Sequence, residues 1–185
     1  MKVLFVCTGN LCRSPMAEVL LKVELRRRGR TDVEVASSGT WGMDGRPATP
    51  EAVETVGELG IDLSSHRARS LDVDEVCSSD IVVAMTSVHV REIIQMVQDA
   101  GPKVVLLKQL RETEVAPLAA GASDAERIRA LLGGGRPASV RAHDLDDPMG
   151  MPLGTYRRTR TELLDGIERL ADLICGPRPN APSSP

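Results

Sequence analysis

The sequence contains very few aromatic residues. Among 185 residues, the only Phe, Trp and Tyr are Phe5, Trp41 and Tyr156. Proteins that bind single-stranded nucleic acids stack bases on several aromatic side chains, so this function is not expected. The sequence also lacks an excess of positive charge, because 23 Lys and Arg residues against 26 Asp and Glu residues give a net charge of -3. A general nucleic-acid or membrane-surface binder depends on clustered positive charge and is therefore not expected either.

Long hydrophobic runs and paired cysteine motifs are absent as well. No run reaches the ~18 apolar residues of a membrane-spanning helix. The apolar run at the N-terminus ends at Cys7, which is too short for the ~7–15-residue core of a signal peptide. We therefore expect a cytoplasmic protein with no membrane partner. The remaining cysteines are Cys12, Cys77 and Cys175, and no Cys-x-x-Cys motif occurs. We expect no disulfide framework, no metal site and no cofactor, and we place Cys77 and Cys175 in the core because they fall in helical patterns.

The chain alternates strand and helix signals. Short apolar runs predict strands buried on both faces of a parallel sheet, at Lys2–Val6, Val33–Ser37, Ile81–Met85 and Lys103–Leu107. Amphipathic patterns predict helices at Pro15–Arg28, Leu71–Cys77, Ser87–Gln98 and Thr155–Ile174. A further helix is predicted to begin at Thr49-Pro50, with Leu59 on its inward face. This alternation predicts the α/β class, as a doubly wound three-layer sandwich of the flavodoxin-like type. The expected sheet has four parallel strands in the order 2-1-3-4.

The length fits a single domain, which we place at residues 1–175. Residues 119–142 are rich in Ala, Gly and Arg and indicate a surface insertion. Within it, Ser123 and Glu126 form a capping box that predicts a short helix up to Leu132. The tail, residues 176–185, contains four prolines and no apolar pattern, so we expect it to be disordered. We expect a monomer.

Chemistry-bearing residues concentrate in the segment after the first predicted strand. This segment runs from Cys7 to Pro15 and leads directly into a helix. A helix N-terminus offers free N–H groups, Gly9 permits a tight anion-binding turn, and the planar guanidinium of Arg13 matches two phosphate oxygens. These surroundings favour the thiolate form of Cys7, which can attack a bound phosphoryl group. The segment lacks the Gly-Lys-Ser/Thr ending of a nucleotide-binding P-loop.

Each of these residues alone has an ordinary structural explanation. Cys7 fits a buried strand end, Gly9 fits a simple turn, and Arg13 fits an exposed helix start. A cation is disfavoured at a helix start, however, and the combination at this spacing is not explained in that way. We therefore predict an oxyanion site at this end of the sheet, where ligands bind in doubly wound folds.

The same stretch resembles the low-molecular-weight protein tyrosine phosphatase family, whose signature is Cys-x5-Arg-Ser near the N-terminus. Here it reads Val-Leu-Phe-Val-Cys-Thr-Gly-Asn-Leu-Cys-Arg-Ser-Pro-Met-Ala-Glu. The likeness continues, in the same order over residues 1–110 and 140–174, in the segments Ala36-Ser37-Ser38-Gly39-Thr40, Ser65-His66-Arg67-Ala68-Arg69 and Asp147-Pro148. The resemblance implies a metal-independent hydrolase that dephosphorylates phosphotyrosine in proteins through a phosphocysteine intermediate.

The resemblance also implies roles for individual residues. Cys7 is the nucleophile, and Asp147 is the general acid, held extended by Pro148. On composition alone, Asp144 and Asp146 are rivals for that role. The phosphate is held by Arg13 together with the loop residues Thr8, Gly9, Asn10, Leu11, Cys12 and Ser14. Asn10, Ser37 and His66 form a supporting network, Ser14 assists the Cys7 thiolate, and Cys7 and Cys12 form a reversible disulfide under oxidation.

The substrate remains open between two residue types. Trp41 either walls a slot for a planar side chain or closes the sheet edge. Phosphotyrosine enzymes of this family usually carry tyrosines after Asp-Pro, whereas Met149, a second candidate pocket residue, and Gly150 stand here. The protein-arginine phosphatase branch tends to have Thr in place of Leu11. Leu11 therefore favours phosphotyrosine, and the missing tyrosines favour phosphoarginine. Less favoured alternatives are an arsenate reductase, which needs further cysteines, and a non-catalytic oxyanion-binding redox sensor.

Overall fold

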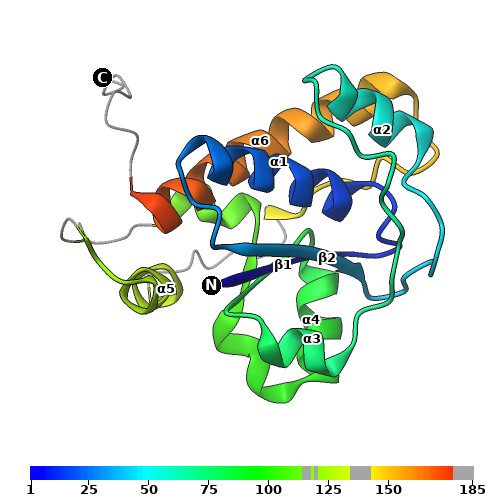
Figure 1. Cartoon of the computed structure of the whole chain (residues 1–185). Coiled ribbons are helices and arrows are strands. Elements are labelled where there is room, and N and C mark those ends of the chain that lie inside the picture. The colour runs from blue at the N-terminus through cyan, green and yellow to red at the C-terminus, as the bar shows by residue number, and fades with distance from the viewer. Residues whose placement is uncertain (114–117, 119–120, 134–142, 177–185) are drawn as a thin grey trace.

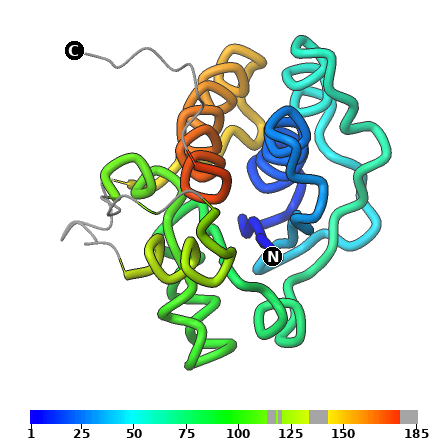
Figure 2. The backbone as a smooth tube through the Cα atoms, turned by 60° about the vertical axis from the view of Figure 1, so that its left-hand side comes forward, coloured from blue at the N-terminus to red at the C-terminus, as the bar shows by residue number. Residues whose placement is uncertain are grey.

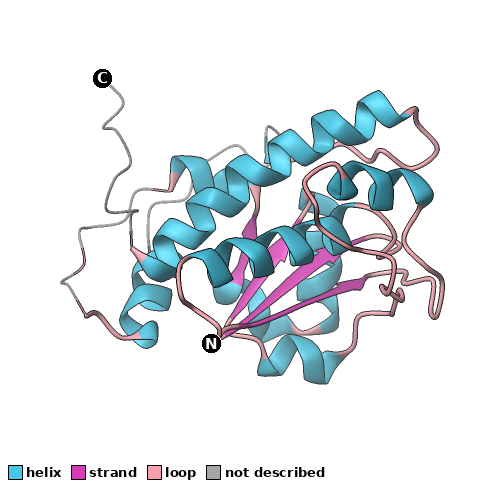
Figure 3. Ribbon diagram, turned by 45° about the horizontal axis from the view of Figure 1, so that its top comes forward, coloured by secondary structure: helices cyan, strands magenta, loops and turns pink. Residues whose placement is uncertain are grey.

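The computed structural model describes residues 1–113, 118, 121–133 and 143–176. Its centre is one parallel sheet with the strand order β2-β1-β3-β4, which confirms the predicted topology (Figure 3). The strands are β1 (Lys2–Cys7), β2 (Glu34–Gly39), β3 (Ile81–Ala84) and β4 (Val104–Leu106). β1 is a central strand, and its last residue, Cys7, lies opposite Gly39 of β2. The loop after β1 therefore emerges where the strand order reverses.

Helices cover both faces of this sheet (Figure 1). One face carries α1 (Arg13–Arg27), α2 (Pro50–Gly57) and α6 (Leu153–Cys175). The other carries α3 (Val73–Ser78) and α4 (Ser87–Met96). Figure 2 shows α5 (Asp124–Gly133) beside the C-terminal end of α6. Two short 3-10 helices, η1 (Gln98–Lys103) and η2 (Lys108–Glu112), flank β4.

Alternate residues of β1 face the two layers, as a strand requires. Val3 and Phe5 belong to the apolar cluster on the α1 and α6 side, whereas Leu4 and Val6 belong to the cluster on the α3 and α4 side. All four side chains are fully buried. Both faces of the sheet are thus apolar, which explains why the strands read as continuous hydrophobic runs.

Most predicted elements are present within one to three residues of their expected ends. The capping box is confirmed, because Ser123 N–H and Oγ both donate to Glu126 at the start of α5. Two minor expectations are wrong: Leu59 follows α2 and is 42% exposed, and the Cys77 thiol is exposed rather than part of the core. The expected disordered tail lies outside the described residues from 177 onward, as does the insertion at 119–120 and 134–142. Among the described helices, none is long and apolar enough to cross a membrane.

Candidate active site

The loop between β1 and α1 turns its carbonyl groups outward. The carbonyl oxygens of residues 8 to 11 each accept a hydrogen bond from a neighbouring segment. The Trp41 N–H donates to the Thr8 carbonyl at 3.0 Å, and the Met43 N–H donates to the Gly9 carbonyl at 3.2 Å. The His66 ring donates from Nε2 to the Asn10 carbonyl at 2.8 Å, and the Thr49 N–H donates to the Leu11 carbonyl at 3.0 Å. Segments that follow β2 and precede β3 therefore hold the loop from outside.

The loop amides consequently face the opposite side. In a trans peptide, the C=O of one residue and the N–H of the next point in opposite directions. The N–H groups of residues 9 to 12 therefore point inward, and none of them donates to a protein acceptor within the part of the chain that is described. Together with the start of α1, they form a bowl of amide donors that suits an anion.

Cys7 lies at the base of this bowl. Its side chain is 3% exposed, and its Sγ atom is 2.9 Å from Ser14 Oγ in the first turn of α1. Ser14 Oγ also accepts a hydrogen bond from Asn10 Nδ2, at 2.9 Å. The Ser14 hydroxyl has two acceptors within reach, the Cys7 sulfur at 2.9 Å and the Ser38 carbonyl oxygen at 3.4 Å, and the sulfur is the nearer of the two. A cysteine held in this way beneath converging N–H groups is positioned as a nucleophile toward a bound oxyanion.

Asn10 holds the loop in its shape. It is the only described residue other than glycine with a positive φ, +55°, and its side chain is fully buried. Its Nδ2 atom donates to Ser14 and to Ser37, each at 2.9 Å, and its Oδ1 atom accepts from the Arg69 N–H at 3.0 Å. Since His66 binds the Asn10 carbonyl, the structure brings together the three supporting residues that the resemblance implied, Asn10, Ser37 and His66.

Two residues of this network were missed in the sequence. Glu18 accepts the Ser37 hydroxyl at 2.6 Å, and Arg69 donates from Nε to the Ser37 carbonyl at 2.9 Å while pairing with Glu75. Glu18 lies in the quoted motif and Arg69 in the quoted Ser-His-Arg-Ala-Arg segment. The residues were therefore visible, but nothing in the sequence indicated that their partner is Ser37.

Arg13 is the buried cation of the site. Its side chain is 4% exposed. Nη1 donates to the Leu145 carbonyl at 3.0 Å, and Nη2 donates to Asp147 Oδ2 at 2.6 Å. Among the described residues, the buried Nε–H has no acceptor. A buried guanidinium with a free N–H beside an amide bowl is equipped to bind a phosphoryl oxygen.

The three acidic candidates in the late loop have different surroundings. Asp147 contacts Arg13 and keeps 47% of its side chain exposed. Asp144 instead places both carboxylate oxygens on Ser87, and Asp146 is exposed. Of the three carboxylates, only Asp147 contacts Arg13, the first residue of α1.

Cys12 lies on the far side of the loop from solvent. Its Sγ atom is 3.5 Å from the Tyr156 hydroxyl and 3.6 Å from Thr49 Oγ1. Burial raises the pKa of the Cys12 thiol, and it also raises the pKa of the Tyr156 hydroxyl. Both groups are therefore protonated at neutral pH, so Cys12 is not itself a thiolate nucleophile.

A histidine that the sequence did not single out contacts the rim of the loop. His89 Nε2 is 2.9 Å from Thr8 Oγ1, and Nδ1 is 2.9 Å from Thr86 Oγ1. Burial, and to a lesser degree the charge of Arg13, lowers the pKa of His89 to about 4. The ring is therefore neutral at pH 7. Its link to Thr8 spans 81 residues of sequence, which explains why no local pattern revealed it.

The two candidate pocket residues stand at the rim of the bowl. Trp41 is 73% exposed and donates from Nε1 to Glu92 at 3.1 Å, so it does not close the sheet edge. Met149 is 45% exposed, and its N–H donates to Asp147 at 3.2 Å. Met43, which the sequence did not single out, is 42% exposed beside Gly9. The rim therefore carries three exposed apolar side chains, one of them aromatic.

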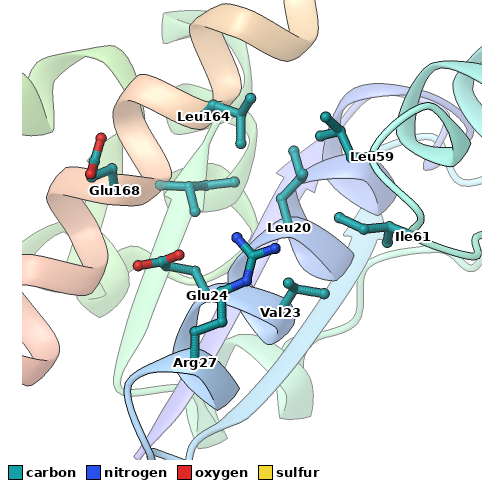
Figure 4. A pocket seen from close by; sticks show the side chains of 9 residues that line it. Leu20, Val23, Glu24, Arg27, Leu59, Ile61, Leu164 and Glu168 are labelled. Atoms are coloured by element: carbon teal, nitrogen blue, oxygen red, sulfur yellow. The ribbon is translucent and has the colours of Figure 1, made fainter.

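A hollow lies between α1, α6 and the segment after α2 (Figure 4). Its floor is apolar, and its charged lining residues are Glu24, Arg27 and Glu168. It contains no nucleophile or histidine. Within the described ranges, no group of three His, Cys, Asp or Glu residues is arranged to hold a metal ion.

An anion-binding loop with a cysteine at its base, at the switch point of a four-stranded parallel sheet, defines the class of cysteine-dependent phosphatases. A family model described as "Low molecular weight phosphotyrosine protein phosphatase" matches residues 2–132. The chain therefore belongs to the low molecular weight phosphotyrosine protein phosphatase family.

Individual relatives have two kinds of activity in their names. The chain is 33% identical over 173 residues to a protein-arginine-phosphatase of Geobacillus stearothermophilus, covering 94% of this chain and 95% of that one. It is 43% identical over 91 residues to a probable low molecular weight protein-tyrosine-phosphatase, EpsP, of Ralstonia solanacearum, covering 49% and 59%.

Solved structures show the same division. A low molecular weight protein tyrosine phosphatase from T. tengcongensis has a TM-score of 0.73 at 35% identity, covering 92% of this chain and 97% of that one. A YwlE arginine phosphatase variant with a phosphorylated active-site serine has a TM-score of 0.72 at 33% identity, covering 93% and 94%.

Proposed function

We propose that this protein hydrolyses phosphotyrosine in phosphoproteins, with Cys7, Arg13 and Asp147 as the catalytic residues. The observation that carries the proposal is the convergence of three groups at the start of α1. The Cys7 sulfur lies beside the Ser14 hydroxyl, the Arg13 guanidinium has a buried Nε–H without a described acceptor, and Asp147 contacts the same guanidinium. A nucleophile, an oxyanion binder and a proton donor are the groups that metal-independent phosphoryl transfer needs.

The reaction has two chemical steps. In the first, the Cys7 thiolate attacks phosphorus, the bond to the leaving oxygen breaks, and Asp147 in its acid form donates a proton to that oxygen. Arg13 and the inward N–H groups of residues 9 to 12 stabilise the charge on the phosphoryl oxygens. In the second step, Asp147 as a carboxylate takes a proton from water, which attacks phosphorus. The S–P bond then breaks and releases phosphate, while the Ser14 hydroxyl stabilises the departing Cys7 thiolate.

The rim supports phosphotyrosine as the substrate residue. The bulky Leu11 side chain is apolar and 8% exposed, and it lies beside Gly9. Trp41 supplies an exposed ring next to Thr8 for contact with a planar side chain. Phosphoarginine is the second candidate, supported by the match over 94% of this chain to a protein-arginine-phosphatase and by Met149 in place of an aromatic residue after Asp147-Pro148.

The test compares one phosphopeptide sequence carrying either phosphotyrosine or phosphoarginine. We expect the higher kcat/KM with phosphotyrosine, and the opposite preference would transfer the assignment to phosphoarginine. Cys7→Ser should reduce turnover of p-nitrophenyl phosphate by at least about 10³-fold. Cys77→Ser is the matched control, because that thiol is exposed, and it should leave turnover unchanged. Full activity of Cys7→Ser would refute the mechanism.

We also propose that hydroperoxides reversibly inactivate the enzyme through a Cys7–Cys12 disulfide. Peroxide oxidises the Cys7 thiolate to a sulfenic acid, and the Cys12 thiol then displaces water to form the disulfide. Both cysteines are reduced in the structure, and Cys12 is held by Tyr156 and Thr49. Activity lost to mild peroxide should return with dithiothreitol in the wild type. Inactivation of the wild type that dithiothreitol cannot reverse would contradict the disulfide.

A further inference from the structure

The loop that carries Asp147 has no regular secondary structure of its own. Residues 143–152 precede α6 without forming a helix or strand other than a single 3-10 residue, and nearly half of the Asp147 side chain is exposed. Proton transfer to a leaving group nevertheless requires a carboxyl group held within hydrogen-bond reach. A displacement of about 1 Å can cost roughly 10²-fold in rate. The loop must therefore be held by contacts with the rest of the molecule.

Two neighbouring residues of the loop make these contacts. Leu145 is 1% exposed, its N–H donates to the Met85 carbonyl at 2.8 Å, and its carbonyl accepts from Arg13. Asp144 uses its whole carboxylate: Oδ1 accepts from the Ser87 N–H at 2.6 Å, and Oδ2 accepts from Ser87 Oγ at 3.1 Å. Asp144 thereby joins the loop to the first turn of α4.

The helix α4 does not depend on Asp144 for its cap. Thr86 is the N-cap residue, and its side chain accepts from the His89 N–H at 3.4 Å. Ser87 itself is 5% exposed, so its contact with Asp144 is shielded from water. Shielding strengthens a hydrogen bond to a carboxylate relative to the same bond in solvent.

The same turn of α4 also contacts the phosphate loop. His89 bonds to Thr8, one residue after the nucleophile, while Ser87 bonds to Asp144, three residues before the general acid. The spacing between Cys7 and Asp147 is therefore set by one rigid element that contacts both segments. Sites built on regular elements are positioned more precisely than sites held by loops alone.

We propose that Asp144 is a positioning residue for the general acid, acting through Ser87 to hold Asp147 over the leaving-group side of Cys7. This inference rests on the proposed function, since it assigns a role to Asp144 in the same reaction. It predicts that loss of Asp144 impairs proton donation while oxyanion binding continues. A purely structural role of Asp144 would weaken all functions of the site together.

The test uses aryl phosphates whose leaving groups differ in their need for a proton. Asp144→Ala should lower kcat/KM roughly 10- to 100-fold for phenyl phosphate and change it less than about 3-fold for 2,4-dinitrophenyl phosphate. Inhibition by inorganic phosphate should be unchanged. Asp144→Asn should restore most of the rate, because an amide can still accept the Ser87 N–H and donate to Ser87 Oγ. Ser87→Ala removes only the hydroxyl contact and should show a smaller loss with the same dependence on the leaving group.

Two further variants separate the possible outcomes. Asp146→Asn is the matched control, because Asp146 is exposed in the same loop, and it should behave as the wild type. If the loss of kcat/KM in Asp147→Asn is the same for both leaving groups, the assignment of Asp147 as the general acid is wrong. The positioning role of Asp144 is overturned if Asp147→Asn loses more kcat/KM with phenyl phosphate than with 2,4-dinitrophenyl phosphate but Asp144→Ala does not. It is also overturned if Asp144→Ala loses inhibition by inorganic phosphate.

Discussion

At the scale of single residues, Asn10 shows how backbone strain and side-chain bonds are combined. A non-glycine residue at φ +55° adopts a conformation that costs about 1 kcal/mol or more. The cost is tolerated because the side chain makes three hydrogen bonds in the buried network that shapes the loop. Asparagine is among the residues that adopt this conformation most readily, so it serves both requirements.

Replacing Asn10 should separate these two contributions. Asn10→Ala loses the three side-chain bonds and keeps an unfavourable φ, so it should lower the free energy of unfolding by about 2–4 kcal/mol. Asn10→Gly loses the same bonds but relieves the strain, so its free energy of unfolding should fall by about 1 kcal/mol less than that of Asn10→Ala. Urea unfolding of both variants provides the comparison. An equal loss in the two proteins would mean that the backbone conformation is not strained.

His89 makes a prediction about pH. Its pKa is about 4 in the folded protein and near 6.5 when unfolded, so the unfolded chain binds the proton first as the pH falls. The neutral ring contributes no pH dependence above pH 6.5, and stability is lost progressively as the pH falls from 6.5 toward 4. Between pH 7 and pH 5 the expected loss from this group is about 2 kcal/mol.

The measurement is the free energy of unfolding of the wild type and of His89→Gln at pH 7 and at pH 5. The wild type should lose about 2 kcal/mol more than the variant over this range. The carboxylates present in both proteins cancel in the difference. Parallel pH profiles would show that His89 carries no such linkage.

At the scale of helices and strands, packing rather than propensity decides the effect of a glycine. Gly166 lies on the buried face of α6, where an added Cβ would be 2.6 Å from Leu107 Cγ and 3.1 Å from its carbonyl oxygen. Leu107 is fully buried and has no room to move. Gly154 lies in the first turn of the same helix, is exposed, and has no atom closer than the end of Arg158 at 4.0 Å.

The two glycines should therefore respond in opposite directions to alanine. Gly154→Ala should raise the free energy of unfolding by about 0.4–1 kcal/mol, because alanine reduces the freedom of the unfolded chain. Gly166→Ala should lower it by about 1–3 kcal/mol through overpacking against Leu107. Thermal or urea unfolding measures both changes. Stabilisation by Gly166→Ala would show that α6 can shift away from Leu107 at little cost.

The elements themselves were largely predictable, because their signals are local. The strand β3 was expected at Ile81–Met85 and is found at Ile81–Ala84, and Thr49 caps α2 as the Thr-Pro pair indicated. Both 3-10 helices were missed, since they lack a periodic apolar pattern. The role of the first turn of α4 was also missed, because its partners Thr8 and Asp144 are 81 and 57 residues away.

At the scale of the whole molecule, the site is assembled from segments that the sheet brings to one edge. The motif after β1 could be identified from the sequence because its residues are contiguous. Asp147 was found only through the resemblance, since 134 residues separate it from Arg13 and the neighbouring Asp144 and Asp146 are chemically equivalent. The three carboxylates differ only in their surroundings: Asp144 bonds to Ser87, Asp147 bonds to Arg13, and Asp146 is exposed to solvent.

A site that joins distant segments links ligand binding to the stability of the entire domain. If residues 1–175 unfold as one unit, inorganic phosphate at about 100 times its Kd should raise the free energy of unfolding by about 2.7 kcal/mol. For a domain of this size, the melting temperature should rise by roughly 5–10 °C. Calorimetry should show a single transition that shifts as a whole, while Arg13→Ala, which removes the guanidinium, should show almost no shift. A second transition that phosphate leaves in place would contradict the single domain, because only segments that unfold together with the phosphate loop are stabilised by its ligand.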